Sequence, residues 1–262
     1  MEGLKILAEI AEDEEDDIPY VDGDSLLELK ITLQTFLRVN GFDYSKEPDF
    51  REMTEENFIK YYETNANGDV LEKFSDLNIR ETFRSNLSDV YTHEESGKKI
   101  FVFFVPTSEV RTNVGIDTVK YFCKLIYLLG CNEGLMISEK DLTSRSRDLL
   151  DSSNVKGFYE GEDIYNVIYY TDSTFISVVD HCLAPEILHI YSGKEVINFS
   201  KQHNINIKEL PRIINTDPVV KFFRGKVGDV IKFKRKTGSE NTLVNEQIVF
   251  RLVVHAGVTK KK

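Results

Sequence analysis

A buried strand, an amphipathic helix and a second buried strand follow one another in the chain, and this order constrains the fold most. The first strand is predicted in "KKIFVFFVP", an apolar run that Pro106 stops. The helix is predicted in "GIDTVKYFCKLIYLLG", where Val119, Phe122, Ile126 and Leu129 recur at spacings of three and four. "EGLMIS" then reads as a strand. This order predicts a βαβ layer and an α/β N-terminal domain.

The flanking segments extend this domain. "SLLELKITLQTFLRVNG" is a predicted helix with Ser25 as N-cap and Gly41 at its end. "MTEENFIKYYETN" is a second helix with Thr54 as N-cap. A short strand is predicted within residues 86–91, and "DLTSRSRDLL" is predicted to hold a short helix.

The pattern changes at Phe175, where "TFISVVD" predicts a strand and "GKEVINFSKQHN" an amphipathic helix. In "NTDPVVKFFRG", Asp217 is the predicted N-cap, Pro218 the first helical residue and Gly225 the end of the turn. "VIKFKR" and "QIVFRLVV" are predicted to pair as strands. We therefore expect a small α+β domain at the C-terminus.

The balance of charged residues also changes at Phe175. The net charge is −11, which counts against a nucleic-acid binder. Residues 175–262 hold 15 Lys and Arg against 8 Asp and Glu, whereas the rest holds 18 against 36. The asymmetry fits two parts with different neighbours, and two ordinary solvated surfaces explain it equally well.

Composition indicates a globular protein, with 41% hydrophobic residues. The longest apolar runs are far shorter than a membrane span, and "MEGLKILAEIAEDEEDD" lacks the features of a secretory signal. Cys123, Cys131 and Cys182 are odd in number and show no CxxC spacing. They predict reduced thiols in an intracellular protein, with no zinc site and no disulfide framework, and no other metal site is expected. His181 stands alone and is predicted to be structural.

An enzyme is the rival class of function. A metal-dependent nuclease needs clustered carboxylates and a lysine, and Glu139, Lys140 and Asp141 are the nearest such group. They are consecutive and lack a partner carboxylate. The chain has no Gly-x-Ser-x-Gly elbow and no P-loop, so no catalytic residue is predicted. A free-standing adaptor is a third alternative.

The run "LPRI…DPVVKFF…GDVIKFKR…FRLVV", preceded by "HCLAPE", resembles the assembly domain of the fifth subunit common to eukaryotic nuclear RNA polymerases. In archaeal polymerases the corresponding subunit consists of that domain alone. Upstream, "IFVFFVPTSEVRTNVGIDTVKYFCKLI" and "SEKDLTSRSRDLL" resemble the eukaryotic jaw domain. The resemblance implies an α/β jaw domain at 25–172 and a small α+β assembly domain at 173–262. The acidic run before them looks longer than in typical relatives and predicts a solvated tail at 1–24. It also implies a non-catalytic subunit without a cofactor.

The resemblance further implies that the assembly domain docks on the largest polymerase subunit, near the small sixth subunit. The residues that fall on the docking motif are Leu210, Pro211, Arg212, Asp217, Pro218, Val219, Gly228, Asp229, Arg235 and Arg251. Turn chemistry alone also explains the prolines, Asp217 and Gly228. The arginines suit partner contact, because a guanidinium holds a carboxylate bidentately, although solvated arginines fit the pattern equally well.

In the jaw, Thr143, Ser144, Arg145, Ser146 and Arg147 fall where the family approaches downstream duplex DNA. Hydroxyls and arginines suit phosphate contact, and an ordinary polar helix start explains the same residues. The family often has proline where Ser144 stands, and histidine where Ile187 stands. No membrane partner and no homo-oligomer are expected. The expected location is the nucleus for a cellular chain, or the virion or host-cell transcription site for one encoded by a large DNA virus.

Overall fold

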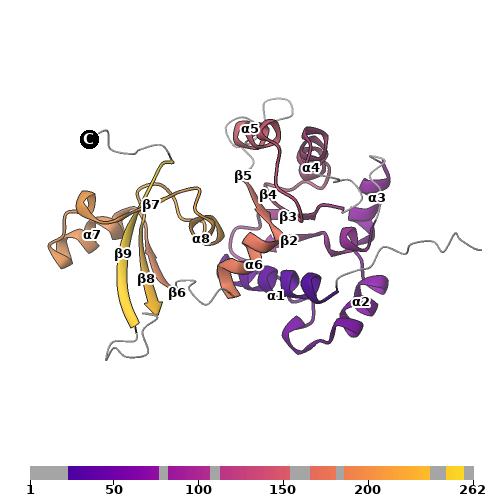
Figure 1. The fold of residues 1–262 in the computed structure, drawn as a ribbon, viewed down its shortest axis with the longest axis horizontal. Helices are drawn as coiled ribbons and strands as arrows, with labels where there is room; N and C mark the ends of the chain where they lie inside the picture. Colours follow the sequence, from indigo (N-terminus) through magenta and orange to yellow (C-terminus); the bar gives the residue numbers. More distant parts are fainter. Residues whose placement is uncertain are drawn as a thin grey trace, which may run out of the picture.

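The computed structural model describes residues 23–76, 82–106, 113–153, 166–180, 186–236 and 246–256, which form two lobes, each built on its own sheet (Figure 1). The N-terminal lobe, residues 23–180, contains a five-stranded sheet in the order β1-β2-β3-β4-β5. Its main elements are α1 (Gly23–Val39), β1 (Phe42–Asp43), η1 (Phe50–Glu52), α2 (Glu55–Thr64), α3 (Gly68–Asp76), η2 (Phe83–Leu87), β2 (Asp89–His93), β3 (Lys99–Phe104), α4 (Ile116–Leu128), β4 (Glu133–Ser138), α5 (Ser144–Ser153), β5 (Asn166–Thr171) and α6 (Asp172–Asp180).

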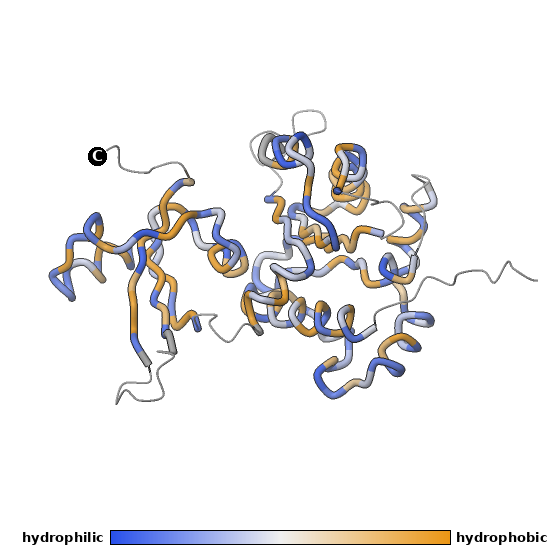
Figure 2. Tube along the Cα trace, viewed as in Figure 1, coloured by the Kyte–Doolittle hydropathy of each residue, from blue (hydrophilic) through white to orange (hydrophobic). Residues whose placement is uncertain are grey.

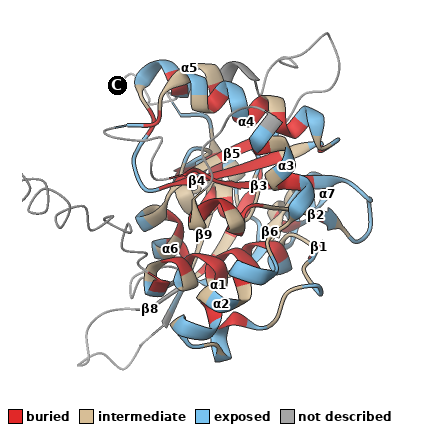
Figure 3. Cartoon of the chain, turned by 90° about the vertical axis from the view of Figure 1, so that its right-hand side faces the viewer, coloured by how far each residue is buried: buried red, intermediate tan, exposed pale blue. Residues whose placement is uncertain are grey.

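Helices cover both faces of this sheet (Figure 3). Its central strands are therefore buried on both sides. Along β3, Ile100, Val102 and Phe104 pack with α1, α2 and α6. The alternate residues Phe101 and Phe103 pack on the opposite face with α3 and α4. Because successive side chains of a strand point to opposite faces, a strand buried on both sides reads as an unbroken apolar run.

The predicted βαβ unit is confirmed. β3 pairs in parallel with β4, and α4 crosses between them. The helix lies so close to β4 that a Cβ atom at Gly134 would overlap with the side chains of Ile126 and Phe122. None of the helices in the described ranges is both long and apolar enough to span a membrane.

Two predicted helix starts in this lobe have different outcomes. Thr54 caps α2, since its side chain accepts a hydrogen bond from the N–H of Asn57 at 3.4 Å, as predicted. The prediction for Ser25 was wrong, because α1 already includes Gly23 and Ser25 lies inside its first turn. The acidic residue that favours the start of this helix is Asp24.

The strand predicted in "TFISVVD" was also wrong, because these residues belong to helix α6. Phe175 and Val178, three residues apart, point into the core of the N-terminal lobe. The side chain of Thr171 accepts a hydrogen bond from the N–H of Thr174 at 3.4 Å, which supports a helix start here. The domain boundary predicted between residues 172 and 173 thus precedes a helix that packs on the N-terminal lobe, and it stays a prediction.

The C-terminal lobe, residues 186–256, contains a four-stranded sheet in the order β6-β8-β9-β7. The predicted antiparallel pairing of β8 and β9 is confirmed, whereas β6 and β7 were not predicted. Its elements are β6 (Glu186–Tyr191), α7 (Lys194–His203), η4 (Ile207–Glu209), β7 (Arg212–Ile214), α8 (Pro218–Phe222), β8 (Val230–Lys236) and β9 (Glu246–Val254). Together the two lobes form a mixed α/β protein with two sheets.

The C-terminal sheet is covered unequally on its two faces. One face carries a small core in which Ile213, Ile231 and Val253 pack with residues of α8. On the other face, Phe199 of α7 packs on Phe250 with ring centroids 4.9 Å apart. Apolar residues therefore run along the strands, as the colouring in Figure 2 shows.

Candidate docking surface and polar loop

Backbone hydrogen bonds fix the start of the docking motif. The N–H of Leu210 donates to the carbonyl of Ile207 at 3.2 Å, and the carbonyl of Pro211 accepts from the N–H of Leu252 at 2.9 Å. Arg212 then begins β7, opposite Leu252 in the parallel strand β9. The side chain of Arg212 is exposed, and no carboxylate in the described ranges forms an ion pair with it.

The helix start at α8 has the predicted form. The side chain of Asp217 accepts a hydrogen bond from the N–H of Val219 at 2.9 Å, and Pro218 occupies the first helical position. The turn also ends as predicted, because the N–H of Gly225 donates a hydrogen bond to the carbonyl of Val220 at 2.9 Å. The residue before it, Arg224, has the left-handed conformation, with φ of +54°.

Helix α8 packs on the N-terminal lobe, between the two sheets (Figure 1). Phe222 is fully buried, with its ring centroid 5.3 Å from that of Phe36 and 5.7 Å from that of Phe175. The side-chain amide of Asn40 donates a hydrogen bond to the carbonyl of Phe222 at 2.9 Å. The predicted docking corner is therefore partly an internal joint of this chain.

Tyr170 of β5 forms a hydrogen bond with the N-terminal end of α8. The hydroxyl of Tyr170 donates to the carbonyl of Pro218 at 2.8 Å. Burial, followed by the negative charge of Asp217, raises the pKa of Tyr170 well above its ordinary value. The hydroxyl therefore stays protonated and keeps its hydrogen bond at neutral pH.

Arg224 completes the contact between the lobes. Its Nη1 lies 2.7 Å from Oε2 of Glu133 in β4, and both side chains are largely buried. Its guanidinium lies over the ring of Phe42 at 4.9 Å and over that of Phe36 at 5.7 Å. We call Phe222, Arg224 and Glu133 the interlobe clasp. The sequence pattern gave no sign of it, because "FFRG" reads as the end of one apolar turn.

Gly228 and Asp229 serve the turn before β8. Gly228 has φ of +97°, a conformation that favours glycine, and its N–H donates to the carbonyl of Val253 at 3.0 Å. The buried carboxylate of Asp229 accepts from the N–H of Lys226 at 2.7 Å. Their roles in the described structure are therefore local.

The two arginines predicted in the strand pair lie further along the sheet. Arg235 lies in β8 opposite Gln247, and its side chain falls outside what the structure describes. Arg251 lies in β9 opposite Ile231, half-buried, and within the described ranges its Nε atom has no hydrogen-bond partner. Among the described residues, Arg251 does not line the groove beside Arg212.

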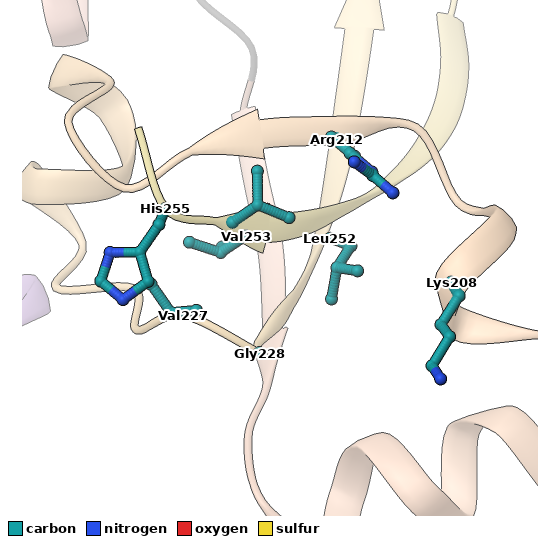
Figure 4. A pocket seen from close by; sticks show the side chains of 8 residues that line it. Lys208, Arg212, Val227, Gly228, Leu252, Val253 and His255 are labelled. Carbon is teal, nitrogen blue, oxygen red and sulfur yellow. The ribbon is translucent and has the colours of Figure 1, made fainter. Parts of the chain in front are cut away.

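A groove with a volume of about 310 Å³ lies beside Arg212 on the C-terminal lobe (Figure 4). In that view Val227 and His255 stand at one end, Lys208 at the other, and Leu252 between them. The residues that line it are Lys208, Arg212, Val227, Gly228, Leu252, Val253, Val254 and His255. Two of the predicted docking residues, Arg212 and Gly228, thus lie in one groove.

Residues 143–147, for which we keep the name polar loop, are Thr143 and the first four residues of helix α5. Thr143 Oγ1 accepts a hydrogen bond from the N–H of Ser146 at 3.2 Å, and the buried hydroxyl of Ser146 donates to the carbonyl of Val114 at 2.8 Å. Ser144 and Arg145 are exposed. Thr143 and Ser146 therefore shape the loop, whereas Ser144 and Arg145 face outward.

Arg147 forms an ion pair with Asp141, in which its Nη2 atom donates to both carboxylate oxygens at 3.0 and 2.9 Å and both side chains are more than half exposed. A cleft of about 1350 Å³ between the lobes is lined by both of these residues, together with Lys226 and Asp229. The end of the polar loop and the turn before β8 therefore face one cleft.

The residues considered for a nuclease pair with neighbouring cations. Glu139 lies 3.1 Å from Lys140, and Asp141 pairs with Arg147. In the described ranges, no group of three or more His, Cys, Asp or Glu side chains is placed to hold a metal ion.

The thiols that the structure describes are buried. Cys123 and Cys131 are both buried, and burial raises the pKa of Cys131 to about 12. His181 and Cys182 lie outside the described residues.

The C-terminal lobe is similar in sequence to known proteins. The sequence profile of the family described as RNA polymerase Rpb5, C-terminal domain, matches residues 176–253. The DNA-directed RNA polymerase subunit Rpo5 of Methanothrix thermoacetophila is 38% identical over 78 residues, which cover 30% of this chain and 94% of that protein. Rpo5 of Methanocaldococcus jannaschii is 32% identical over 79 residues, 30% of this chain and 100% of that protein.

A eukaryotic relative extends the match upstream. The DNA-directed RNA polymerases I, II, and III subunit RPABC1 of Caenorhabditis briggsae is 23% identical over 176 residues, 65% of this chain and 74% of that protein. The chain is therefore a non-catalytic subunit of a multisubunit DNA-directed RNA polymerase. It belongs to the Rpb5 family, the fifth subunit of these polymerases, and is not itself an enzyme.

Proposed function

We propose that the C-terminal lobe docks this chain on the largest subunit of a multisubunit RNA polymerase, next to the small sixth subunit. The observation that carries this proposal is that Arg212 is exposed at the edge of an apolar groove and forms no ion pair with a described residue. The neighbouring motif residues Asp217 and Phe222 are committed to the fold, which leaves Arg212 available to a partner carboxylate.

The N-terminal lobe acts in this proposal as a jaw that lies near downstream duplex DNA. Arg145 supports it, because it is exposed at the start of α5 and forms no ion pair with a described residue. The hydroxyl of Ser146 already donates a hydrogen bond to the carbonyl of Val114, and Arg147 already forms an ion pair with Asp141. DNA contact is therefore local and positional, as expected for phosphate contacts on an acidic lobe.

The proposed assembly also sets where the chain works. In a eukaryotic cell this role places it in the nucleus, and a relative is named as shared by polymerases I, II and III. A chain encoded by a large DNA virus would instead act in the virion or at the host-cell transcription site.

The test is native purification of the full chain through an N-terminal tag, with the co-purified proteins identified by mass spectrometry. The tag stays off the C-terminus because His255 lines the groove. The two largest polymerase subunits are expected with the wild type and with Lys201→Glu, a control on the exposed surface of α7. Arg212→Glu is expected to weaken their binding about tenfold or more.

Two outcomes would contradict the proposal. A wild-type chain recovered alone would show that it does not dock on a polymerase. Recovery with unrelated partners would favour the free-standing adaptor instead.

A further inference from the structure

We propose that the groove beside Arg212 receives an extended acidic segment of another polymerase subunit. One apolar side chain of that segment rests on Leu252, and its flanking carboxylates pair with Lys208 and Arg212. This inference rests on the proposed docking function and deepens it by assigning the site and the chemistry of its partner.

The floor of the groove selects an apolar side chain. Leu252 is half-buried, and Val227 at its end is 45% exposed although it is apolar. Gly228, beside Val227, adds no side chain that would fill the space. The volume of about 310 Å³ is at the low end for binding pockets, so it suits a side chain and its backbone.

The rim of the groove selects negative charge. Lys208 and Arg212 are both exposed, and neither forms an ion pair with a carboxylate in the described ranges. Among the residues that the structure describes, none that lines the groove is acidic. By contrast, Lys234 on the same sheet pairs with Glu186 at 3.7 Å. An unmatched pair of cations beside an apolar floor is complementary to carboxylates that flank an apolar residue.

A peptide fits this surface better than a nucleic acid does. A phosphate backbone would satisfy Lys208 and Arg212 but would leave Leu252 and Val227 in contact with water. A peptide covers both, and burial of its apolar residue adds to the charge-assisted hydrogen bonds. The acidic run at residues 12–17 of this chain is a competing occupant that the experiment distinguishes.

The experiment places a photoreactive phenylalanine analogue at Val227 of the N-terminally tagged full chain. After native purification and irradiation, the crosslinked peptide is sequenced by mass spectrometry. The expected product is a peptide of another polymerase subunit in which Asp or Glu flanks an apolar residue. A crosslink to DNA, to residues 1–22, or to a second copy would overturn the proposal.

The same experiment separates the two proposals. Co-purification of the polymerase without a crosslink at Val227 would refute the groove and leave docking intact. If the wild-type chain fails to co-purify, docking itself is refuted and the groove with it.

Charge and apolar variants complete the test. Lys208→Glu and Val227→Asp are each expected to weaken polymerase binding about tenfold, and binding of the wild type should weaken as salt rises. Ile248→Asp is the matched control, because Ile248 is an exposed apolar residue of β9 that does not line the groove. Equal losses with Ile248→Asp and Val227→Asp would show a general effect of the sheet surface and overturn the assignment.

Discussion

Replacing Arg224 by alanine tests whether the interlobe clasp holds the two lobes together. The change removes the 2.7 Å ion pair with Glu133 and the cation–π contacts with Phe36 and Phe42. It leaves Glu133 at the lobe boundary without its cation, in a position where its side chain is only 14% exposed.

The expected loss of unfolding free energy is about 3 kcal/mol. Breaking a fully buried pair by removing one partner costs about 3–5 kcal/mol. The lower end applies because the side chain of Arg224 is 21% exposed. Its Nε and Nη2 atoms also lack hydrogen-bond partners among the described residues, so alanine loses no bond there.

Backbone conformation gives an internal control. Arg224 has φ of +54°, a conformation that costs a non-glycine residue about 1 kcal/mol. Arg224→Gly removes the same side chain as Arg224→Ala but relieves this strain. It should therefore be about 1 kcal/mol more stable than the alanine variant.

Urea unfolding followed by circular dichroism suits this chain, which has no tryptophan. A double-mutant cycle with Glu133→Gln should give a coupling energy of about 1–2 kcal/mol. Small-angle scattering of Arg224→Ala should show a larger radius of gyration as the lobes separate. If the two single losses add within about 0.5 kcal/mol and the scattering is unchanged, the clasp does not join the lobes.

Three further predictions follow from single residues. Asp217→Ala should lower the unfolding free energy by about 1 kcal/mol, whereas Asp217→Asn should nearly preserve it, because asparagine also caps α8; urea unfolding measures both. Since the pKa of Cys131 rises from 9.0 in a solvated thiol to about 12 in the fold, the stability that it contributes is complete below pH 9 and falls as pH rises toward 12. Cys131→Ala should flatten the measured stability over that window. Arg145→Glu should reduce the salt slope of duplex binding by the assembled polymerase by about one unit, with Lys201→Glu as the control without effect.

The elements that the sequence could predict are those in which local pattern and tertiary packing agree. The apolar run of β3, the three-and-four spacing of α4 and the cap at Asp217 each require a conformation that the fold also uses. Helix α6 was missed because its β-branched residues favour a strand locally, and its helix is stabilised by packing of Phe175 in the N-terminal core.

The sequence pattern does not predict which charged residues are buried and paired. Lys30 of α1 is fully buried and reaches Glu47 at 2.6 Å and the hydroxyl of Tyr91 at 3.0 Å. Arg224 and Glu133 are separated by 91 positions, and nothing local marks them as a pair. Long-range pairs of this kind depend on how whole elements meet, which periodicity within one element does not describe.

The segment from Leu210 to Phe233 has two neighbours. Through Phe222 and Arg224 it faces the N-terminal lobe, and through Arg212 and Val227 it faces the groove. If the groove fixes the C-terminal lobe on a polymerase, the clasp then fixes the position of the polar loop. Loss of the clasp should therefore leave the proposed docking intact while it disturbs the proposed contact of the polar loop with DNA.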